Sequence, residues 1–136
     1  MNQHTSMKPA PLAAEAAGRI LAAAEELFAE LGFDAVSMNA IAARAGVSKA
    51  NIFHHFSSKN ALYIAVLREA CRDAAEDLHI LENDDRPFAE RLANFAQEHL
   101  SHILEREQVT RLIQREIMQN GQQRGQELAE KVFGDK

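Results

Sequence analysis

Residues 37–56 contain two helix-start signals on either side of a single glycine. Ser37 and Ser48 each carry an oxygen that can accept a hydrogen bond from the free backbone N–H groups of a first helical turn, so both are predicted N-caps. Gly46 lies between them and can adopt the positive φ that ends a helix and turns the chain. Two short helices joined by a tight glycine turn form a helix-turn-helix unit. The pattern therefore predicts such a unit over residues 37–56.

The residues of this unit divide into a buried face and an outward face. Ala42 is small enough for the two helices to approach closely, and Val47 is predicted to fill the gap between them. Ile52 and Phe56 are predicted to pack against the first helix, while Phe53 could lie on either face. The other positions of the second helix are hydrogen-bond donors or small, and they are predicted to face outward: Lys49, Ala50, Asn51, His54 and His55.

The charge of the chain is distributed unevenly. It contains 20 acidic and 15 basic residues, a net charge of −5, yet residues 35–68 contain no Asp or Glu. A surface that meets phosphate would exclude acids for electrostatic reasons. Lys59, at the start of the following helix, is predicted to help seat a phosphate. We therefore interpret this segment as a surface for a polyanion, with an ordinary solvated helix face as the alternative.

A longer stretch, residues 20–67, resembles the DNA-binding domain of the tetracycline-repressor (TetR) family of bacterial transcription regulators. The order and spacing of several short elements carry the resemblance. These elements are Leu27-Phe28, Leu31-Gly32-Phe33, Ile41-Ala42, Ala45-Gly46-Val47-Ser48, Phe56, Lys59 and Leu62. Phe53 stands where the family usually has Tyr, whose hydroxyl often meets a DNA phosphate. That contact is expected to be absent, or replaced by His54 or His55.

The resemblance implies a homodimer that binds a near-palindromic double-stranded DNA operator. It also implies that a small-molecule effector, bound among the later helices, moves the two DNA-reading helices apart. The residues that it places at the DNA, together with the outward face described above, are Ser37, Ser48, Lys49, Ala50, Asn51, Phe53, His54, His55 and Lys59.

The composition of the whole chain favours an all-α protein. It has no Trp and 1 Tyr, and it is rich in Ala, Leu, Glu and Arg, which are good helix formers. We expect a disordered arm over residues 1–11, a three-helix DNA-binding domain over 12–60, and an incomplete helical bundle for ligand binding and dimerisation over 61–136. Family members are generally longer, so the chain is expected to be a fragment, or else a short member that dimerises in another way.

The second half shows further helical patterns over residues 58–81, 87–104 and 109–118. Asn120 and Gly121 are predicted to end the last of these, and residues 122–133 could form another helix. We expect these helices to leave apolar surface exposed. Their apolar stripes supply the predicted ligand-binding residues, which are Leu78, Phe88, Leu92, Phe95, His99, Ile103, Ile113 and Ile117.

Other classes of function find little support in the sequence. There is no glycine-rich phosphate loop and no nucleophile motif, so we expect no catalytic residue and no cofactor. His99 and His102 are three apart on one predicted helix, but a metal site needs three or four ligands, and we expect none. No apolar run approaches the roughly 20 residues that cross a bilayer. The single Cys71 suits a reducing cytoplasm.

The sequence therefore indicates a cytoplasmic, DNA-binding transcription regulator, a repressor that a small molecule releases. The alternative is a helical ligand-binding or protein-interaction module whose helix-turn-helix no longer binds DNA. Because phosphate contacts make DNA affinity depend on salt, salt-dependent binding to duplex DNA distinguishes the two.

Overall fold

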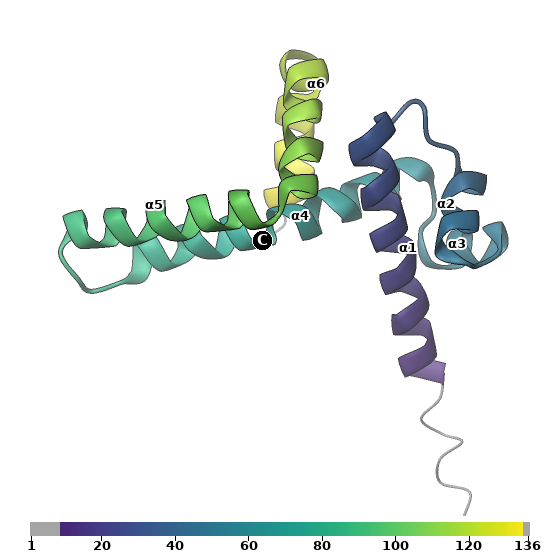
Figure 1. Ribbon diagram of the computed structural model, residues 1–136, viewed down its shortest axis with the longest axis horizontal. Helices are drawn as coiled ribbons and strands as arrows, with labels where there is room; N and C mark the ends of the chain where they lie inside the picture. Colours follow the sequence, from purple (N-terminus) through teal and green to yellow (C-terminus); the bar gives the residue numbers. More distant parts are fainter. Residues whose placement is uncertain (1–8, 135–136) are drawn as a thin grey trace, which may run out of the picture. The chain divides into compact units, whose positions relative to one another are not determined.

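The structure, a computed structural model, describes residues 9–134. Over these residues the chain forms six helices and no strand, which confirms the all-α prediction. The helices are α1 (Pro9–Leu31), α2 (Met38–Ala45), α3 (Lys49–His55), α4 (Lys59–Asn83), α5 (Phe88–Glu105) and α6 (Glu107–Phe133) (Figure 1). The chain divides into two compact units between Val66 and Leu67, a little beyond the boundary expected at residue 60. We call them the N-terminal unit and the C-terminal unit.

The N-terminal unit has a closed apolar core to which all four of its helical segments contribute. Ile20 and Phe28 of α1, Ile41 of α2, Ile52 of α3 and Leu62 of α4 are each 0% exposed. Burying a side chain of this size contributes roughly 1.5–3 kcal/mol relative to leaving it in water. These five side chains therefore hold the short α2 and α3, which could not persist as isolated helices.

An aromatic cluster closes one end of this core. The ring of Tyr63 lies edge-on to Phe28 with centroids 4.9 Å apart, and Phe33 lies 4.9 Å from Tyr63 and 5.9 Å from Phe28. Aromatic pairs at such distances add about 0.5–1.5 kcal/mol beyond the area that they bury. The cluster thus fixes the loop after α1 against the beginning of α4.

The two ends of α1 compare differently with the sequence. Gly32 follows the end of the helix, with φ 88° and its N–H donating to the Phe28 carbonyl over 2.9 Å, as a residue that can adopt the left-handed region does at a helix end. The start lies earlier than expected, because α1 begins at Pro9 and residues 9–11 are helical instead of part of an arm. Proline is tolerated in a first helical turn, where its missing N–H would have no partner. The remainder of the expected arm lies outside the described residues.

In the C-terminal unit, α4 and α5 form an antiparallel helical hairpin (Figure 1). The hairpin is joined by polar contacts: Arg91 of α5 donates to the Leu81 carbonyl over 2.7 Å, and His102 of α5 is hydrogen-bonded to Asp77 of α4 over 3.0 Å. Pro87 precedes α5, in agreement with the predicted break before it.

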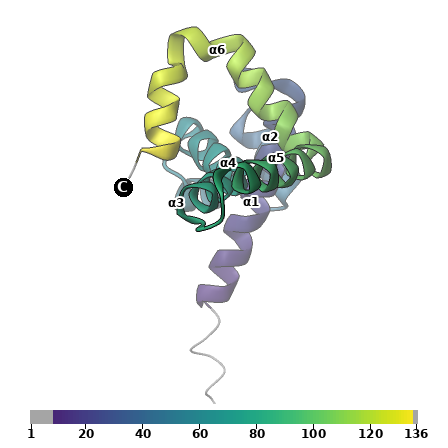
Figure 2. The same cartoon turned by 90° about the vertical axis from the view of Figure 1, so that its left-hand side faces the viewer.

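The last helix corrects the sequence analysis. Residues 107–133 form one continuous helix, α6, whereas Asn120 and Gly121 were expected to end a helix there. Gly32 and Gly46 are the described glycines with positive φ, so Gly121 keeps a helical backbone. A glycine that can end a helix is not obliged to do so, and its cost inside one is only about 1 kcal/mol relative to Ala. Instead α6 bends strongly along its length (Figure 2), as helices containing several glycines do.

The C-terminal unit buries little apolar surface. Helix α5 has a pronounced apolar stripe but no buried residue, and the buried apolar side chains of α6 are Val109, Leu112 and Leu128. The expected exposure of apolar surface is confirmed on all three helices. The large exposed apolar side chains are Leu78, Ile80, Phe88, Leu92, Leu100, Ile103, Leu104, Ile117 and Met118.

Candidate functional site

The helix-turn-helix unit has the local geometry that its sequence predicts. The Ser37 hydroxyl accepts a hydrogen bond from the Ala40 N–H over 3.0 Å, and the Ser48 hydroxyl accepts one from the Asn51 N–H over 3.0 Å. Gly46 caps α2 with φ 73° in the left-handed region. Both N-caps and the glycine turn are therefore confirmed. The Ser37 and Ser48 hydroxyls act only as acceptors in these caps, so their O–H groups remain available as donors.

Helix α3 turns one face inward and the other to solvent. Ile52 is fully buried, which anchors the helix. Phe53, for which both faces were open, is 44% exposed. Phe56 was expected in the core but is half-buried, because it follows the last turn in an extended conformation, with φ −135° and ψ 123°. The outward face is as predicted, with His55 half-buried and the other members exposed: Lys49, Ala50, Asn51 and His54.

A shallow hollow of about 490 Å³ lies between the outward face of α3 and the first part of α1. Ala13 and Ala16 form its α1 side. The imidazoles of His54 and His55 meet nearly at right angles on the other side, with centroids 5.3 Å apart. None of the described residues that line this hollow is acidic. A negatively charged group can therefore approach α3 without meeting a carboxylate there.

Lys59 does not extend freely into solvent, as the expected phosphate contact would suggest. Its ammonium donates a hydrogen bond to the Val36 carbonyl over 2.8 Å and lies 4.2 Å from the centroid of the Phe33 ring. Both contacts are within the N-terminal unit, and both tie the loop after α1 to the start of α4. The structure therefore gives Lys59 a structural task that the sequence analysis missed. The sequence signal that could have indicated this task is Phe33, an aromatic residue directly after Gly32, which follows the end of α1.

Other basic residues of the acid-free stretch are also engaged within the protein. Arg44 forms an ion pair with Glu26 of α1 over 2.8 Å, and Arg68 donates to the Lys131 carbonyl over 2.9 Å. Lys49 lies on the outward face of α3 and is exposed. The potential of that face consequently depends on Lys49, the two histidines and the absence of acids more than on a cluster of free cations.

The C-terminal unit contains an apolar pocket of about 530 Å³ between α4, α5 and α6. Of the eight residues predicted to bind a ligand, it brings together His99, Ile103, Ile113 and Ile117. The sequence analysis missed the α4 wall and the second half of α6, because it ended the last helix too early. The lining residues that were not expected are Leu67, Cys71, Ala74, Thr110, Gln114, Glu116, Gly121, Gly125, Leu128, Ala129 and Val132.

The other four predicted ligand-binding residues lie elsewhere. Leu78, Phe88 and Leu92 are each about half exposed and line neither this pocket nor the hollow described next. Phe95 stacks on His99 with centroids 5.4 Å apart and an interplanar angle of 7°. Phe95 lines a different hollow, so it contacts His99 from outside the pocket, and the structure does not bring Leu78, Phe88 and Leu92 into the pocket.

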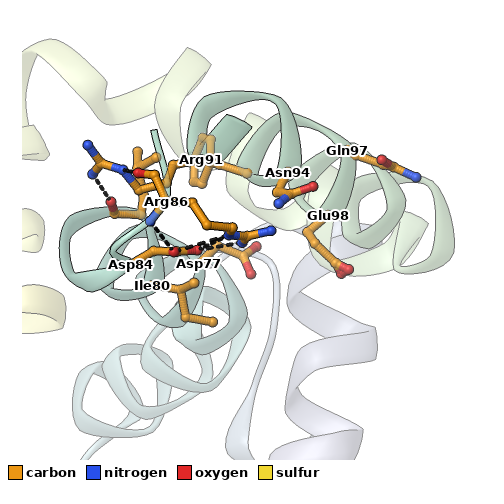
Figure 3. A pocket seen from close by; sticks show the side chains of 10 residues that line it. Asp77, Ile80, Asp84, Arg86, Arg91, Asn94, Gln97 and Glu98 are labelled. Atoms are coloured by element: carbon orange, nitrogen blue, oxygen red, sulfur yellow. Dashed lines mark hydrogen bonds and ion pairs between the residues drawn. The ribbon is translucent and has the colours of Figure 1, made fainter. Parts of the chain in front are cut away.

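That second hollow, of about 390 Å³, lies near the turn between α4 and α5 (Figure 3). Its walls are polar and are locked by internal contacts. The Arg86 side chain binds both oxygens of Asp84, and this hydrogen bonding lowers the pKa of Asp84 to about 2. Arg91 donates to the Arg86 carbonyl over 2.8 Å. The side chains of Asp84, Arg86 and Arg91 form hydrogen bonds within the turn. We therefore interpret the hollow as part of a stabilised turn.

A histidine pair and a buried carboxylate also meet between α4 and α5. Asp77 is 8% exposed, and its Oδ2 lies 3.0 Å from His102 Nδ1 and 4.0 Å from His99 Nδ1. Among the described residues, no group of three or more His, Cys, Asp or Glu side chains is arranged to hold a metal ion. The described helices are also all too short or too polar to span a membrane.

Comparison with known proteins identifies the N-terminal unit. A family model described as bacterial regulatory proteins of the tetR family matches residues 20–66, which include α2, the glycine turn and α3. Residues 20–66 therefore resemble the bacterial regulatory proteins of the tetR family. The FasR transcriptional activator of Mycolicibacterium smegmatis is 52% identical over 54 residues, 40% of this chain and 25% of FasR. The RutR regulator of Escherichia coli K12 is 43% identical over 70 residues, 52% of this chain and 33% of RutR.

Solved structures extend the likeness beyond the matched sequence. A protein of Vibrio parahaemolyticus described as a TetR-family transcriptional regulator is 30% identical, with a TM-score of 0.61 over 88% of this chain and 64% of its own. The fatty acid degradation regulator FadR of Bacillus halodurans has the same fold, with 23% identity and a TM-score of 0.67 over 85% of this chain and 57% of FadR. The chain therefore spans a quarter to a third of these two curated relatives and about three fifths of these solved structures.

The helix-turn-helix unit thus lies on a well-packed set of helices. The matched residues 20–66 coincide closely with the N-terminal unit, while the pocket is built from residues after the match. The exposed Phe53 ring carries no hydroxyl to donate to a phosphate. The neighbouring imidazoles of His54 and His55 line the shallow hollow beside α3.

Proposed function

We propose that this chain is a sequence-specific, DNA-binding transcription regulator whose helix α3 enters the major groove. One observation carries the proposal: α3 presents an exposed face free of acids, while Ile52 and two N-capped helices fix its orientation. The major groove admits an α-helix, and the second helix of a helix-turn-helix reads it. The similarity of residues 20–66 to bacterial regulatory proteins of the tetR family supports the same function.

The side chains on the face of α3 suit different parts of a DNA site. The Asn51 amide can form a paired donor and acceptor contact with adenine, and the Ala50 methyl can pack against the methyl group of thymine. Lys49 can donate to guanine or to a phosphate. His54 and His55 would take the backbone contact that Phe53 cannot make. The Ser37 and Ser48 hydroxyls would donate to phosphates that flank the reading helix.

The pocket supports regulation by a small molecule. Helix α4 begins at Lys59 in the N-terminal unit, and its residues Leu67, Cys71 and Ala74 line the pocket in the C-terminal unit. A ligand that favours one position of this shared helix would bias the placement of α3. We accordingly propose a cytoplasmic repressor without enzymatic activity, homodimeric on its operator, which the ligand releases. FasR is named an activator, so a reporter gene behind the selected operator must establish the direction of control.

The test is selection of binding sites from random duplex DNA, because the operator is unknown. The unmodified chain should enrich one sequence, and Asn51→Ala should change the preferred bases at a cost of about 1–3 kcal/mol for the original site. Gln97→Ala, an exposed amide on α5, is the matched control and should leave the preference unchanged.

Two results would contradict this function. Failure to enrich any sequence, together with no salt-dependent affinity for duplex DNA, would favour the alternative of a helical module that does not bind DNA. Enrichment that Asn51→Ala leaves intact would remove α3 from the reading position.

A further inference from the structure

We propose that the pocket of the C-terminal unit takes an elongated apolar ligand with a positively charged amine, and that the Glu116 carboxylate receives this charge. The inference deepens the small-molecule regulation proposed above and rests on it for its biological meaning. It concerns the chemical class of the ligand, for which the walls of the pocket provide the argument.

Most of the pocket wall is hydrocarbon. Leu67 and Ala74 come from α4, Ile103 from α5, and Ile113 and Leu128 from the two halves of α6. The volume of about 530 Å³ lies within the range of pockets that hold small molecules. Because these walls offer few hydrogen-bonding groups, most of the ligand must be apolar.

An acidic side chain faces the pocket. Glu116 lines it and is 7% exposed, and none of the described residues that line it is Lys or Arg. A second buried carboxylate, Asp77, lies 4.0 Å from Nδ1 of the lining residue His99. Coulomb interactions strengthen where water is excluded, so a carboxylate on the ligand would be repelled and an ammonium group attracted.

His99 offers a second polar atom at the α5 wall. Its Nδ1 is buried and has no hydrogen-bond partner among the described residues, while its ring is held flat against Phe95. An N–H of a ligand amine could donate to this atom when the ring presents its unprotonated nitrogen there. A primary amine can therefore use both the charge of Glu116 and the acceptor on His99.

The first experiment compares ligands of one length on the unmodified chain, with decylammonium, decanoate and decanol as probes. Calorimetry gives each affinity, and protection of the single Cys71 from a maleimide reports occupancy of the pocket that Cys71 lines. Burial raises the pKa of the Cys71 thiol, so labelling is run at alkaline pH, where enough thiolate forms. Decylammonium should bind at least roughly tenfold more tightly than decanoate, and should slow the labelling of Cys71.

The second experiment removes the charge and keeps the shape. Glu116→Gln should abolish the preference for decylammonium over decanoate, while Glu105→Gln, an exposed residue on α5, should retain it. Equal or tighter binding of decanoate to the unmodified chain would overturn the proposal, whether or not the variant folds. An unchanged preference in a folded Glu116→Gln chain would overturn it as well.

The ligand class and the DNA-binding function can fail separately. Site selection without ligand tests the DNA-binding function alone. If a sequence is enriched but decanoate binds better, the ligand class is wrong and the regulator stands. If decylammonium is preferred and nothing is enriched, the pocket assignment stands and the DNA-binding function falls.

Discussion

The two units of this chain achieve order in different ways. The N-terminal unit encloses five large side chains completely, whereas α5 in the C-terminal unit encloses none and leaves Phe88 59% exposed. A closed core resists deformation, and an open one can repack around a partner or ligand. The difference would suit the proposed function, in which the N-terminal unit presents α3 in one orientation and the C-terminal unit responds to a ligand.

The largest expected effect compares one phenylalanine from each unit. Phe28→Ala should lower the free energy of unfolding by about 3–5 kcal/mol, because it opens a cavity in the closed core and removes an aromatic partner of Tyr63. Phe88→Ala should change it by no more than about 0.5 kcal/mol. Urea unfolding monitored by circular dichroism measures both. Similar losses in the two variants would show that the units do not differ as described.

A second comparison places the same substitution at one glycine in each unit. Gly46 has φ 73°, so Gly46→Ala should destabilise by about 1–2 kcal/mol. Gly121 is helical, and a methyl group there would meet Ile117 at an ordinary 3.7 Å, so Gly121→Ala should stabilise by up to about 1 kcal/mol. Thermal unfolding gives both signs. Destabilisation by Gly121→Ala would restore the helix end that the sequence suggested.

These two glycines also show what the sequence could and could not predict. Gly46 sits between two serine caps, and three local signals agreed on a turn before any packing was known. Gly121 follows Asn120 with no helix cap after it, and the same residue type is consistent with either an end or a bend. Tertiary contacts decide between a helix end and a bend. Leu128, in the part of α6 that follows Gly121, is buried, and its packing favours a helix that continues.

The candidate sites differ in the same way. The outward face of α3 follows from helical periodicity alone, so its members could be named from the sequence. The destination of Lys59 could not, because the Val36 carbonyl and the Phe33 ring meet it only once the loop has folded. Half of the residues predicted to bind a ligand lie outside the pocket for a related reason. Periodicity identifies a stripe on each helix, but not which stretch of it meets the other helices.

A third prediction contrasts an outward lysine with an engaged one. Lys49→Ala should lower the slope of log affinity against log salt by about 0.9, since one phosphate contact would be lost. Lys59→Ala should leave that slope unchanged and lower the free energy of unfolding by about 1 kcal/mol, through the lost bond to Val36 and the lost contact with Phe33. Binding isotherms at several salt concentrations, with Lys131→Ala as a remote control, measure the slopes. If Lys59→Ala also lowered the slope of log affinity against log salt, the Lys59 ammonium would have to contact a DNA phosphate.

The smallest expected effect lies at the turn between α4 and α5, where surface charges replace an apolar core. Hydrogen bonds from Arg86 lower the pKa of Asp84 from 3.8 to about 2, so the ionised carboxylate is favoured in the folded turn. Any stability from this pair is therefore fully present above about pH 4 and is lost as the pH falls towards 2.

Carbon-13 NMR of the Asp84 carboxyl should give a midpoint near 2. Arg86→Gln should move the midpoint up towards the ordinary value, and Arg72→Gln, remote in the sequence and paired with Glu69, should not. Because the Arg86 side chain of this pair is half exposed to solvent, the loss of the pair should not register in urea unfolding at neutral pH. A measurable fall in the free energy of unfolding in Arg86→Gln would mean that polar contacts at the turn stabilise the C-terminal unit, as the closed apolar core stabilises the N-terminal unit.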